Sequence, residues 1–244
     1  MAEPFYYVTP KWFKGNLPAF FENSAYPMTR ILEDHSQVII EEIISFYSRD
    51  SDKLSKNFAP YNVDTTGWNT MTLFSYGILN PQFLGYLPRT WSLLKDYPGL
   101  SLVMVSVLSP GVRLKAHFGD TDAIIRNHLG VVIPAPLPAA GIRIKTESRG
   151  WRPGEVLSFC VLNRHYAWNF SDKPRIVLIV DFIKPEFLNQ QREIEGKVLA
   201  AEGMKLIATR FPVTKKIPRW LTLFLHSVLG VCANLYVRLF KQRL

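Results

Sequence analysis

Cysteine is scarce in this 244-residue sequence, which contains two, Cys160 and Cys232, without a close partner for either. A disulfide framework and a zinc site built on thiolates both need more cysteines at short spacings, so both are excluded. The N-terminus lacks a basic start followed by an apolar run, and we therefore expect no signal peptide. With 48% hydrophobic and 13% aromatic residues, the chain can bury a sizeable core in one domain.

Acidic residues are absent from residues 203–244, although eight basic residues fall there. The net charge of +9 therefore describes the C-terminal tail rather than the rest of the chain. Within this tail, residues 220–237 form an 18-residue run without a formal charge, and basic residues flank the run on both sides. A helix that spans a membrane needs about 20 apolar residues, so this run is at the short end.

Three structures are possible for the tail: a helix in the membrane interface, a short span or hairpin, and a helix packed on the domain or on a second subunit. We expect a membrane surface as partner, through residues 215–244, with the catalytic part facing the cytosol. Nucleic acid is excluded as a partner, because the basic residues are interleaved with leucine, valine and phenylalanine.

The rest of the chain divides by its periodicity. Residues 1–99 are expected to form a helical and loop-rich cap, with helices at residues 31–47 and 88–97. From residue 100 the pattern changes to short β-branched segments separated by glycine and proline, which predicts a β-sandwich or barrel over residues 100–187. Residues 188–244 are expected to form helices that end in the basic, apolar tail.

Three of the five histidines and two spaced arginines lie among these β segments. His117 and His165 fall on different segments, which suits an iron held by few protein ligands, with positions left for a co-substrate and O₂. A keto acid that chelates iron through one end needs a basic partner for its far carboxylate. Arg175 begins the strand after His165, and we expect it to return beside this histidine and offer a bidentate fork.

The motifs of this region occur in a characteristic order: His117-x-Gly119, Arg126-x-His128-Leu-Gly, Trp151-x-x-Gly154, His165-x-x-Trp168 and Arg175-x-x-x-x-Val-Asp181. Together they resemble the aspartyl/asparaginyl β-hydroxylase family over about residues 100–187. The resemblance implies a mainly β structure with a double-stranded β-helix core, also called a jelly roll or cupin-like fold. It also implies a dioxygenase that uses Fe(II), 2-oxoglutarate and O₂.

The resemblance implies how the metal and the co-substrate are held. His117 and His165 match the two iron-binding histidines. Arg175 matches the arginine that pairs with the distal carboxylate of 2-oxoglutarate, and His128 and Ser106 match further contacts of the co-substrate. On the residues alone, Ser106 could equally be a buried strand serine.

Gly119 stands where many iron oxygenases carry a carboxylate ligand. The aspartyl branch of the family likewise has glycine there, whereas branches that hydroxylate the acyl chains of lipid A have aspartate. We expect the adjacent Asp120 to face away from the metal, with a role at the metal as the alternative. The resemblance implies that Arg126 grips the acidic group of the substrate; on the residues alone, it could pair with Asp120 or Asp122.

The substrate stays open between two classes. Gly119 and Arg126 favour hydroxylation of the β-carbon of an aspartyl or asparaginyl residue in a peptide or protein. The basic, apolar tail favours a lipid-linked substrate instead, such as the acyl chain of lipid A or of an amino-acid lipid. A hypothesis of another class is a catalytically silent jelly roll that binds a carboxylate or a membrane partner, which would not need the paired histidines.

Overall fold

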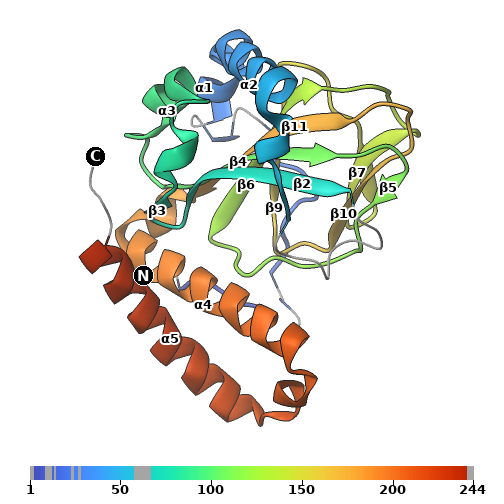
Figure 1. The fold of residues 1–244 in the computed structure, drawn as a ribbon. Coiled ribbons are helices and arrows are strands. Elements are labelled where there is room, and N and C mark those ends of the chain that lie inside the picture. Colours follow the sequence, from blue (N-terminus) through green and yellow to red (C-terminus); the bar gives the residue numbers. More distant parts are fainter. Residues whose placement is uncertain are drawn as a thin grey trace.

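Two antiparallel β-sheets face each other at the centre of the molecule (Figure 1). The computed structural model of the chain describes residues 3–8, 13, 15–22, 25–26, 29–57 and 67–240. The larger sheet has the order β1-β2-β4-β11-β6-β9, and β3 pairs with β2. Its strands are β1 (Ser55–Lys56), β2 (Trp68–Ser75), β3 (Ile78–Leu79), β4 (Leu100–Leu108), β6 (Ile124–Val132), β9 (Val156–Cys160) and β11 (Arg175–Ile183).

The smaller sheet has the order β5-β10-β7-β8. Met104 and Ile179 of the larger sheet share a buried hydrophobic cluster with Ile142 of the smaller one, so the two sheets enclose a common core. This arrangement is the expected double-stranded β-helix. The strands of the smaller sheet are β5 (Val112–Arg113), β7 (Ala140–Ile144), β8 (Glu147–Arg149) and β10 (His165–Asn169).

Helices cover the other face of the larger sheet. Ile43 and Phe46 of the second helix belong to one hydrophobic cluster with Val105 of β4 and Leu178 of β11. Because both faces of the sheet are covered, β4 and β11 are buried along their whole length. The helix expected at residues 31–47 is present, but a turn at His35 divides it. The helical elements here are α1 (Arg30–Asp34), α2 (Ser36–Asp50), η3 (Ser51–Lys53), η5 (Pro81–Phe83) and α3 (Pro88–Leu94).

The β region begins before residue 100, so the expected helical and loop-rich character of the whole of residues 1–99 is wrong. β2 pairs with β4 from Trp68↔Leu108 to Ser75↔Leu102, which makes it an integral strand of the larger sheet. Its sequence mixes Asn and Thr with apolar residues, and its buried positions do not alternate strictly along the strand. Because of this mixture, the segment does not form the β-branched apolar run that predicts a strand.

A helical hairpin, made of α4 (Gln191–Arg210) and α5 (Arg219–Phe240), follows the sheets. The element η6 (Pro185–Gln190) leads into α4, and η7 (Pro212–Lys216) connects the two helices. Figure 1 shows α4 between the jelly roll and α5. The helices approach closely at two glycines: a Cβ atom on Gly196 would lie 2.5 Å from the carbonyl oxygen of Gly230. Val198 of α4 shares a buried cluster with Ile124 of β6, which ties the hairpin to the jelly roll.

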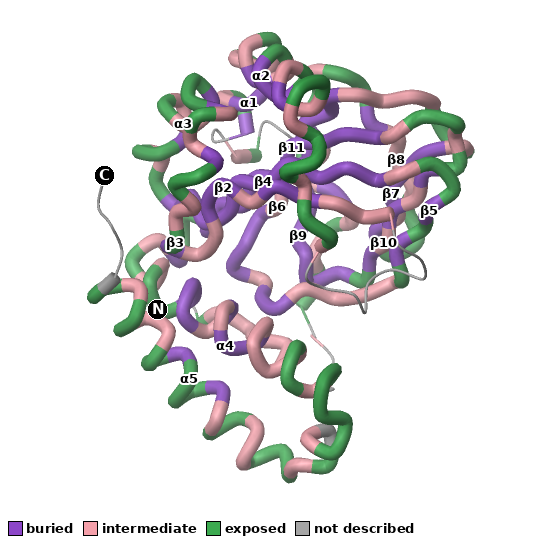
Figure 2. Tube along the Cα trace, viewed as in Figure 1, coloured by how far each residue is buried: buried purple, intermediate pink, exposed green. Residues whose placement is uncertain are grey.

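The outer helix α5 leaves most of its apolar side chains exposed (Figure 2). Among its described residues, His226 and Gly230 are the buried ones. Residues Arg219–Leu239 are long and apolar enough to cross a membrane, and 11% of the most hydrophobic window is buried inside the structure. The helix therefore packs on α4 along a narrow side and offers an apolar outer surface. The large apolar side chains exposed on it are Trp220, Leu223, Phe224, Val228, Leu229, Val231, Leu235, Tyr236 and Leu239.

Candidate active site

His117, which is half-buried, and His165, which is buried, lie side by side in the jelly roll. The main chains of the two residues exchange hydrogen bonds of 3.0 and 2.9 Å, and their ring centroids are 4.2 Å apart. The Nδ1 atom of His117 lies 2.7 Å from the carbonyl oxygen of Lys115, and that of His165 lies 2.7 Å from the carbonyl oxygen of Asn163. A carbonyl oxygen only accepts, so both Nδ1 atoms carry the proton and both Nε2 atoms keep a lone pair for a metal.

Burial keeps both imidazoles neutral. It lowers the pKa of His117 to about 4. Burial, together with the neighbouring His117, lowers the pKa of His165 well below its ordinary value. Metals bind the neutral imidazole, so the pair is prepared for a metal at neutral pH.

Gly119 leaves no room on one side for a carboxylate ligand. A Cβ atom on Gly119 would lie 2.6 Å from the Cβ atom of Val161, and the Gly119 N–H already donates to the Val161 carbonyl oxygen at 2.7 Å. The adjacent Asp120 forms an ion pair with Lys205 of α4, with 2.6 Å between Oδ1 and Nζ. Over the described part of the chain, no group of three or more His, Cys, Asp or Glu side chains could hold a metal. The protein thus offers two histidines, and the remaining positions fall to other donors.

A second group of buried polar atoms lies beside the histidine pair. Arg175 is 2% exposed, and its Nε and Nη1 atoms have no hydrogen-bond partner among the described residues. The same holds for both ring nitrogens of His128 and for Nε1 of Trp151. The Arg175 guanidinium lies over the Trp151 ring, 4.7 Å from its centroid, and the His128 ring stacks on Trp151 with 6.1 Å between centroids.

These orphaned donors fit a small carboxylate. Burial lowers the pKa of Arg175 to about 9, which still leaves it charged at neutral pH. Burial, with help from Arg126 and Arg175, lowers the pKa of His128 well below its ordinary value. A buried arginine without a counterion is costly, and an anion bound by Arg175, His128 and Trp151 would satisfy these groups. We call these three residues the carboxylate cradle.

Phe159 of β9 connects the carboxylate cradle to the histidine pair. Its ring centroid lies 5.0 Å from that of His128 and 5.6 Å from that of His165. Arg175 begins the strand after His165, as expected, but this strand does not lie beside the strand of His165. His165 belongs to β10 of the smaller sheet, whereas Arg175 begins β11 of the larger one. The two residues therefore belong to opposite sheets that share the core.

Arg126 is held by a partner that the sequence did not indicate. It donates from Nε and Nη2 to the two carboxylate oxygens of Asp181, at 2.8 and 2.7 Å. The register of β6 with β11 sets Arg126 directly opposite Asp181, whose side chain is fully buried. The alternative partners are wrong, since Asp120 pairs with Lys205 and Asp122 accepts from the Phe5 N–H.

Ser106 is buried on β4, and its hydroxyl oxygen accepts a hydrogen bond of 3.0 Å from Trp68 Nε1. Among the described residues the Ser106 hydroxyl donates to no acceptor, so its proton could serve a ligand. Trp68 also lines a pocket of about 110 Å³ that contains His117, His165 and Arg126. We call this the site pocket. α4 closes one side of it with Val198, Glu202 and Lys205.

Some residues of the site carried no role in the sequence reasoning. Trp151 was part of a motif, and Phe159 lay in an expected strand, but neither pattern shows which side chains meet in the core. Glu202 and Lys205 come from the hairpin, and nothing in their local sequence indicates that α4 lies against the site pocket. A Glu and a Lys three residues apart, paired as Glu202 and Lys205 are, are ordinary for an exposed helix face.

The sequence matches the family described as Aspartyl/Asparaginyl beta-hydroxylase over residues 33–185. The chain belongs to this family. It is 32% identical over 180 residues to an ornithine lipid ester-linked acyl 2-hydroxylase from Rhizobium tropici, which covers 72% of this chain and 64% of that protein. It is also 32% identical over 130 residues to the human aspartyl/asparaginyl beta-hydroxylase, with coverage of 51% of this chain and 17% of the human protein.

The chain therefore spans less than two thirds of the length of either relative. Among solved structures, a Pseudomonas putida prolyl-4-hydroxylase aligns at 14% identity with a TM-score of 0.41, over 61% of this chain and 87% of that one. The match to the family model confirms the expected family, which is a family of hydroxylases.

Proposed function

We propose that the protein is an Fe(II)- and 2-oxoglutarate-dependent dioxygenase that hydroxylates an unactivated C–H bond. The observation that carries this proposal is the neutral pair His117 and His165 in the same core as Arg175, which is buried and whose Nε and Nη1 atoms have no partner among the described residues. When bound, iron with 2-oxoglutarate and O₂ supplies the oxidation: one oxygen atom enters the C–H bond, and the other enters succinate as CO₂ leaves.

The residues of the chain position these reactants. His117 and His165 would hold Fe(II) through Nε2, and Arg175 would pair with the distal carboxylate of 2-oxoglutarate. His128 stays neutral and can donate one hydrogen bond to that carboxylate without adding a second buried charge. Ser106 would add a hydroxyl donor. Since the carboxylate cradle is buried, water does not compete for the co-substrate there.

For the substrate, we infer the acyl chain of an amino-acid-containing membrane lipid. The acyl hydroxylase relative matches more of this chain than the human peptide hydroxylase does. Arg126, the residue suited to bind an acidic side chain, already donates hydrogen bonds from Nε and Nη2 to Asp181. The exposed apolar surface of α5, together with the basic tail, would bring the enzyme to a membrane that contains such lipids.

A second candidate is the β-carbon of an aspartyl or asparaginyl side chain. Two features favour it: Gly119 matches the aspartyl branch, and Arg126 lines the site pocket with Nη1 left over after its pairing with Asp181. In this case the salt bridge with Asp181 would orient Arg126 toward an acidic substrate.

Mass spectrometry of the lipids and of the peptides from cells separates these candidates. Cells that produce the wild-type protein are compared with cells that produce His117→Ala or His165→Ala. We expect a gain of one oxygen atom in an acyl lipid that depends on both histidines. The same gain confined to aspartyl or asparaginyl peptides would replace the lipid with the second candidate. A histidine-independent pattern in both fractions would contradict the proposed dioxygenase.

A further inference from the structure

An apolar groove of about 700 Å³ runs along the hairpin, between α4 and α5, and is closed on one side by Tyr7 and Val8. Its walls are mainly aliphatic, and its polar groups lie toward the connection between the helices, apart from Lys205. The residues that line it from the hairpin are Ala201, Met204, Lys205, Ile207, Ala208, Thr214, Ile217, Arg219, Thr222, Leu225 and Leu229.

The inner end of the groove meets the site pocket. Lys205 lines both spaces, and its ammonium group is held there by Asp120 at 2.6 Å and by Glu202 at 3.0 Å. A second connection runs through aromatic rings: Tyr7 of the groove stacks on Phe118 of the site pocket, with 5.3 Å between centroids. A molecule that fills the groove therefore ends beside the wall that contains His117 and His165.

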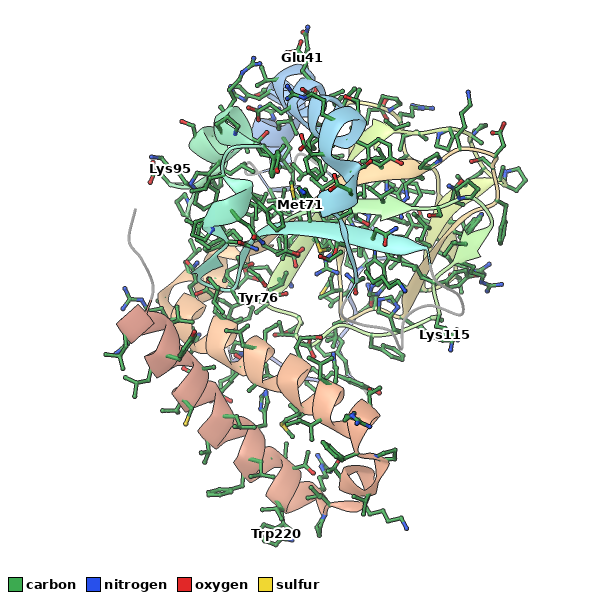
Figure 3. All side chains as sticks on the ribbon, in the orientation of Figure 1. Glu41, Met71, Tyr76, Lys95, Lys115 and Trp220 are labelled. Carbon is green, nitrogen blue, oxygen red and sulfur yellow. The ribbon has the colours of Figure 1, made fainter. Side chains whose placement is uncertain are left out.

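The outer end of the groove opens at the hairpin tip, which we define as residues 206–224. Apolar side chains are exposed there, with Val213 at 70%, Trp220 at 69%, Phe224 at 60% and Phe211 at 56%. Figure 3 shows Trp220 at the far end of the hairpin, directed away from the jelly roll. The tip also has four basic residues and no acidic one, a combination suited to the surface of an anionic membrane. The basic residues are Arg210, Lys215, Lys216 and Arg219.

We propose that this groove holds the acyl chain of a membrane lipid, while the head end of that lipid reaches the site pocket. The inference rests on the proposed function and names the route by which its substrate enters. From Ala208 to Ala201 the groove follows α4 for about 10 Å, at 1.5 Å per residue. A lipid embedded at the tip would keep its chain in apolar surroundings along this path and expose only the carbons near its head to the metal.

The chemistry of the groove favours a lipid over a protein partner. A peptide in this place would need partners for its main-chain polar groups, and the aliphatic walls supply few. An acyl chain needs none. The exposed apolar and basic residues of the hairpin tip continue the groove outward, which matches a chain that extends back into the bilayer.

Binding of cis-parinaric acid, a fluorescent fatty acid, to the full-length protein tests the groove itself. Ala208→Trp fills the groove from α4, and Thr209→Trp places the same side chain at the next position, which is exposed and does not line the groove. We expect Ala208→Trp to weaken binding about tenfold or more, as excluding two or more methylene groups would. Thr209→Trp should bind as the wild type does. Equal binding of the fatty acid by the wild type and Ala208→Trp would contradict the groove as its binding site.

Leu225→Asn tests the opposite wall, in case Ala208→Trp does not fold. It makes the groove polar from α5 and is likewise expected to weaken binding of the fatty acid. Affinity for Co(II) is measured in every variant as a check that the site is folded. A folded Leu225→Asn protein with unchanged binding of the fatty acid would also overturn the groove.

Activity on mixed vesicles of phosphatidylglycerol and ornithine lipid separates this inference from the proposed function. Hydroxylated lipid should form with the wild type and Thr209→Trp, and fall about tenfold with Ala208→Trp. A second outcome is that the wild type forms no hydroxylated lipid while Ala208→Trp still binds the fatty acid more weakly than the wild type. This result would contradict the lipid substrate but support the groove as a lipid-binding site. If lipid is hydroxylated equally by all three proteins, the proposed function stands and the groove is overturned.

Discussion

The guanidinium of Arg175 lies over the ring of Trp151, 4.7 Å from its centroid, between the two sheets and 2% exposed. Neither Arg175 Nε nor Arg175 Nη1 has an acceptor among the described residues. The site thus keeps a buried charge that costs stability in the free protein and that a carboxylate ligand would neutralise.

Replacement of Arg175 by methionine should separate stability from ligand binding. Since the buried charge is removed, Arg175→Met is expected to be more stable than the wild type without ligand, by roughly 1–3 kcal/mol. It should also lose the increase in melting temperature that 2-oxoglutarate gives the wild type in the presence of Co(II). Arg113→Met is the matched control, because Arg113 lies over the Tyr166 ring at 4.5 Å but is exposed. If 2-oxoglutarate raises the melting temperature of Arg175→Met as much as that of the wild type, Arg175 does not bind the co-substrate.

Gly119 should tolerate a side chain only when Val161 is reduced. The Cβ atom of Gly119→Ala would meet the Val161 side chain at 2.6 Å, and this overpacking is expected to cost about 1–3 kcal/mol in the free energy of unfolding. Val161→Ala in the same chain should recover most of the loss. The four proteins of this double-mutant cycle are compared by urea denaturation. Additive losses would show that contact with Val161 is not what requires glycine here.

The salt bridge between Arg126 and Asp181 should be structural. Asp181→Asn leaves a buried charge without its partner and is expected to lose roughly 3–5 kcal/mol, whereas Arg126→Met combined with Asp181→Leu should regain most of it. If the substrate is a lipid, the double variant should still hydroxylate it. A folded double variant that forms succinate without substrate, but no longer hydroxylates any substrate, would assign Arg126 to substrate binding.

The histidine pair should bind metal almost independently of pH in the neutral range. The pKa of His117 is about 4, and that of His165 is also lowered, so protons compete for Nε2 only in acid. The affinity for Co(II) is expected to stay constant from about pH 8 to 6 and to fall below about pH 5. Two ordinary histidines, with a pKa near 6.5, would lose about tenfold between pH 8 and 6. Such a loss in a Co(II) absorption titration would contradict the burial of the pair.

The short β-branched segments predict a β-sandwich or barrel, because they are local patterns. The jelly roll and the roles of the site residues follow only from the resemblance of the ordered motifs to a known family. His117 lies beside His165, and His128 lies near Arg175, while the roles that the resemblance gives these residues stay predictions. The partner of Arg126 was missed, because Asp181 is 55 residues away and only the register of β6 with β11 brings the two together.

Strand β2 and the groove of the hairpin are two further features that the sequence does not predict. β2 has Asn and Thr among its apolar residues, and a register shift between Thr72 and Phe74 interrupts its alternation, so its periodicity is weak. The groove depends on how α4 and α5 cross at Gly196 and Gly230, and a glycine pair in two separate helices does not reveal that crossing. Both features come from packing between distant segments.

The central claim, that His117 and His165 hold Fe(II) while the carboxylate cradle holds 2-oxoglutarate, is tested most directly by an anaerobic titration. Addition of Fe(II) and then 2-oxoglutarate to the wild type should produce a weak charge-transfer band in the visible spectrum. His117→Ala and His165→Ala should abolish this band, and Arg175→Met should require much more 2-oxoglutarate to reach it. No band with the wild type, or an unchanged band in both histidine variants, would contradict the account.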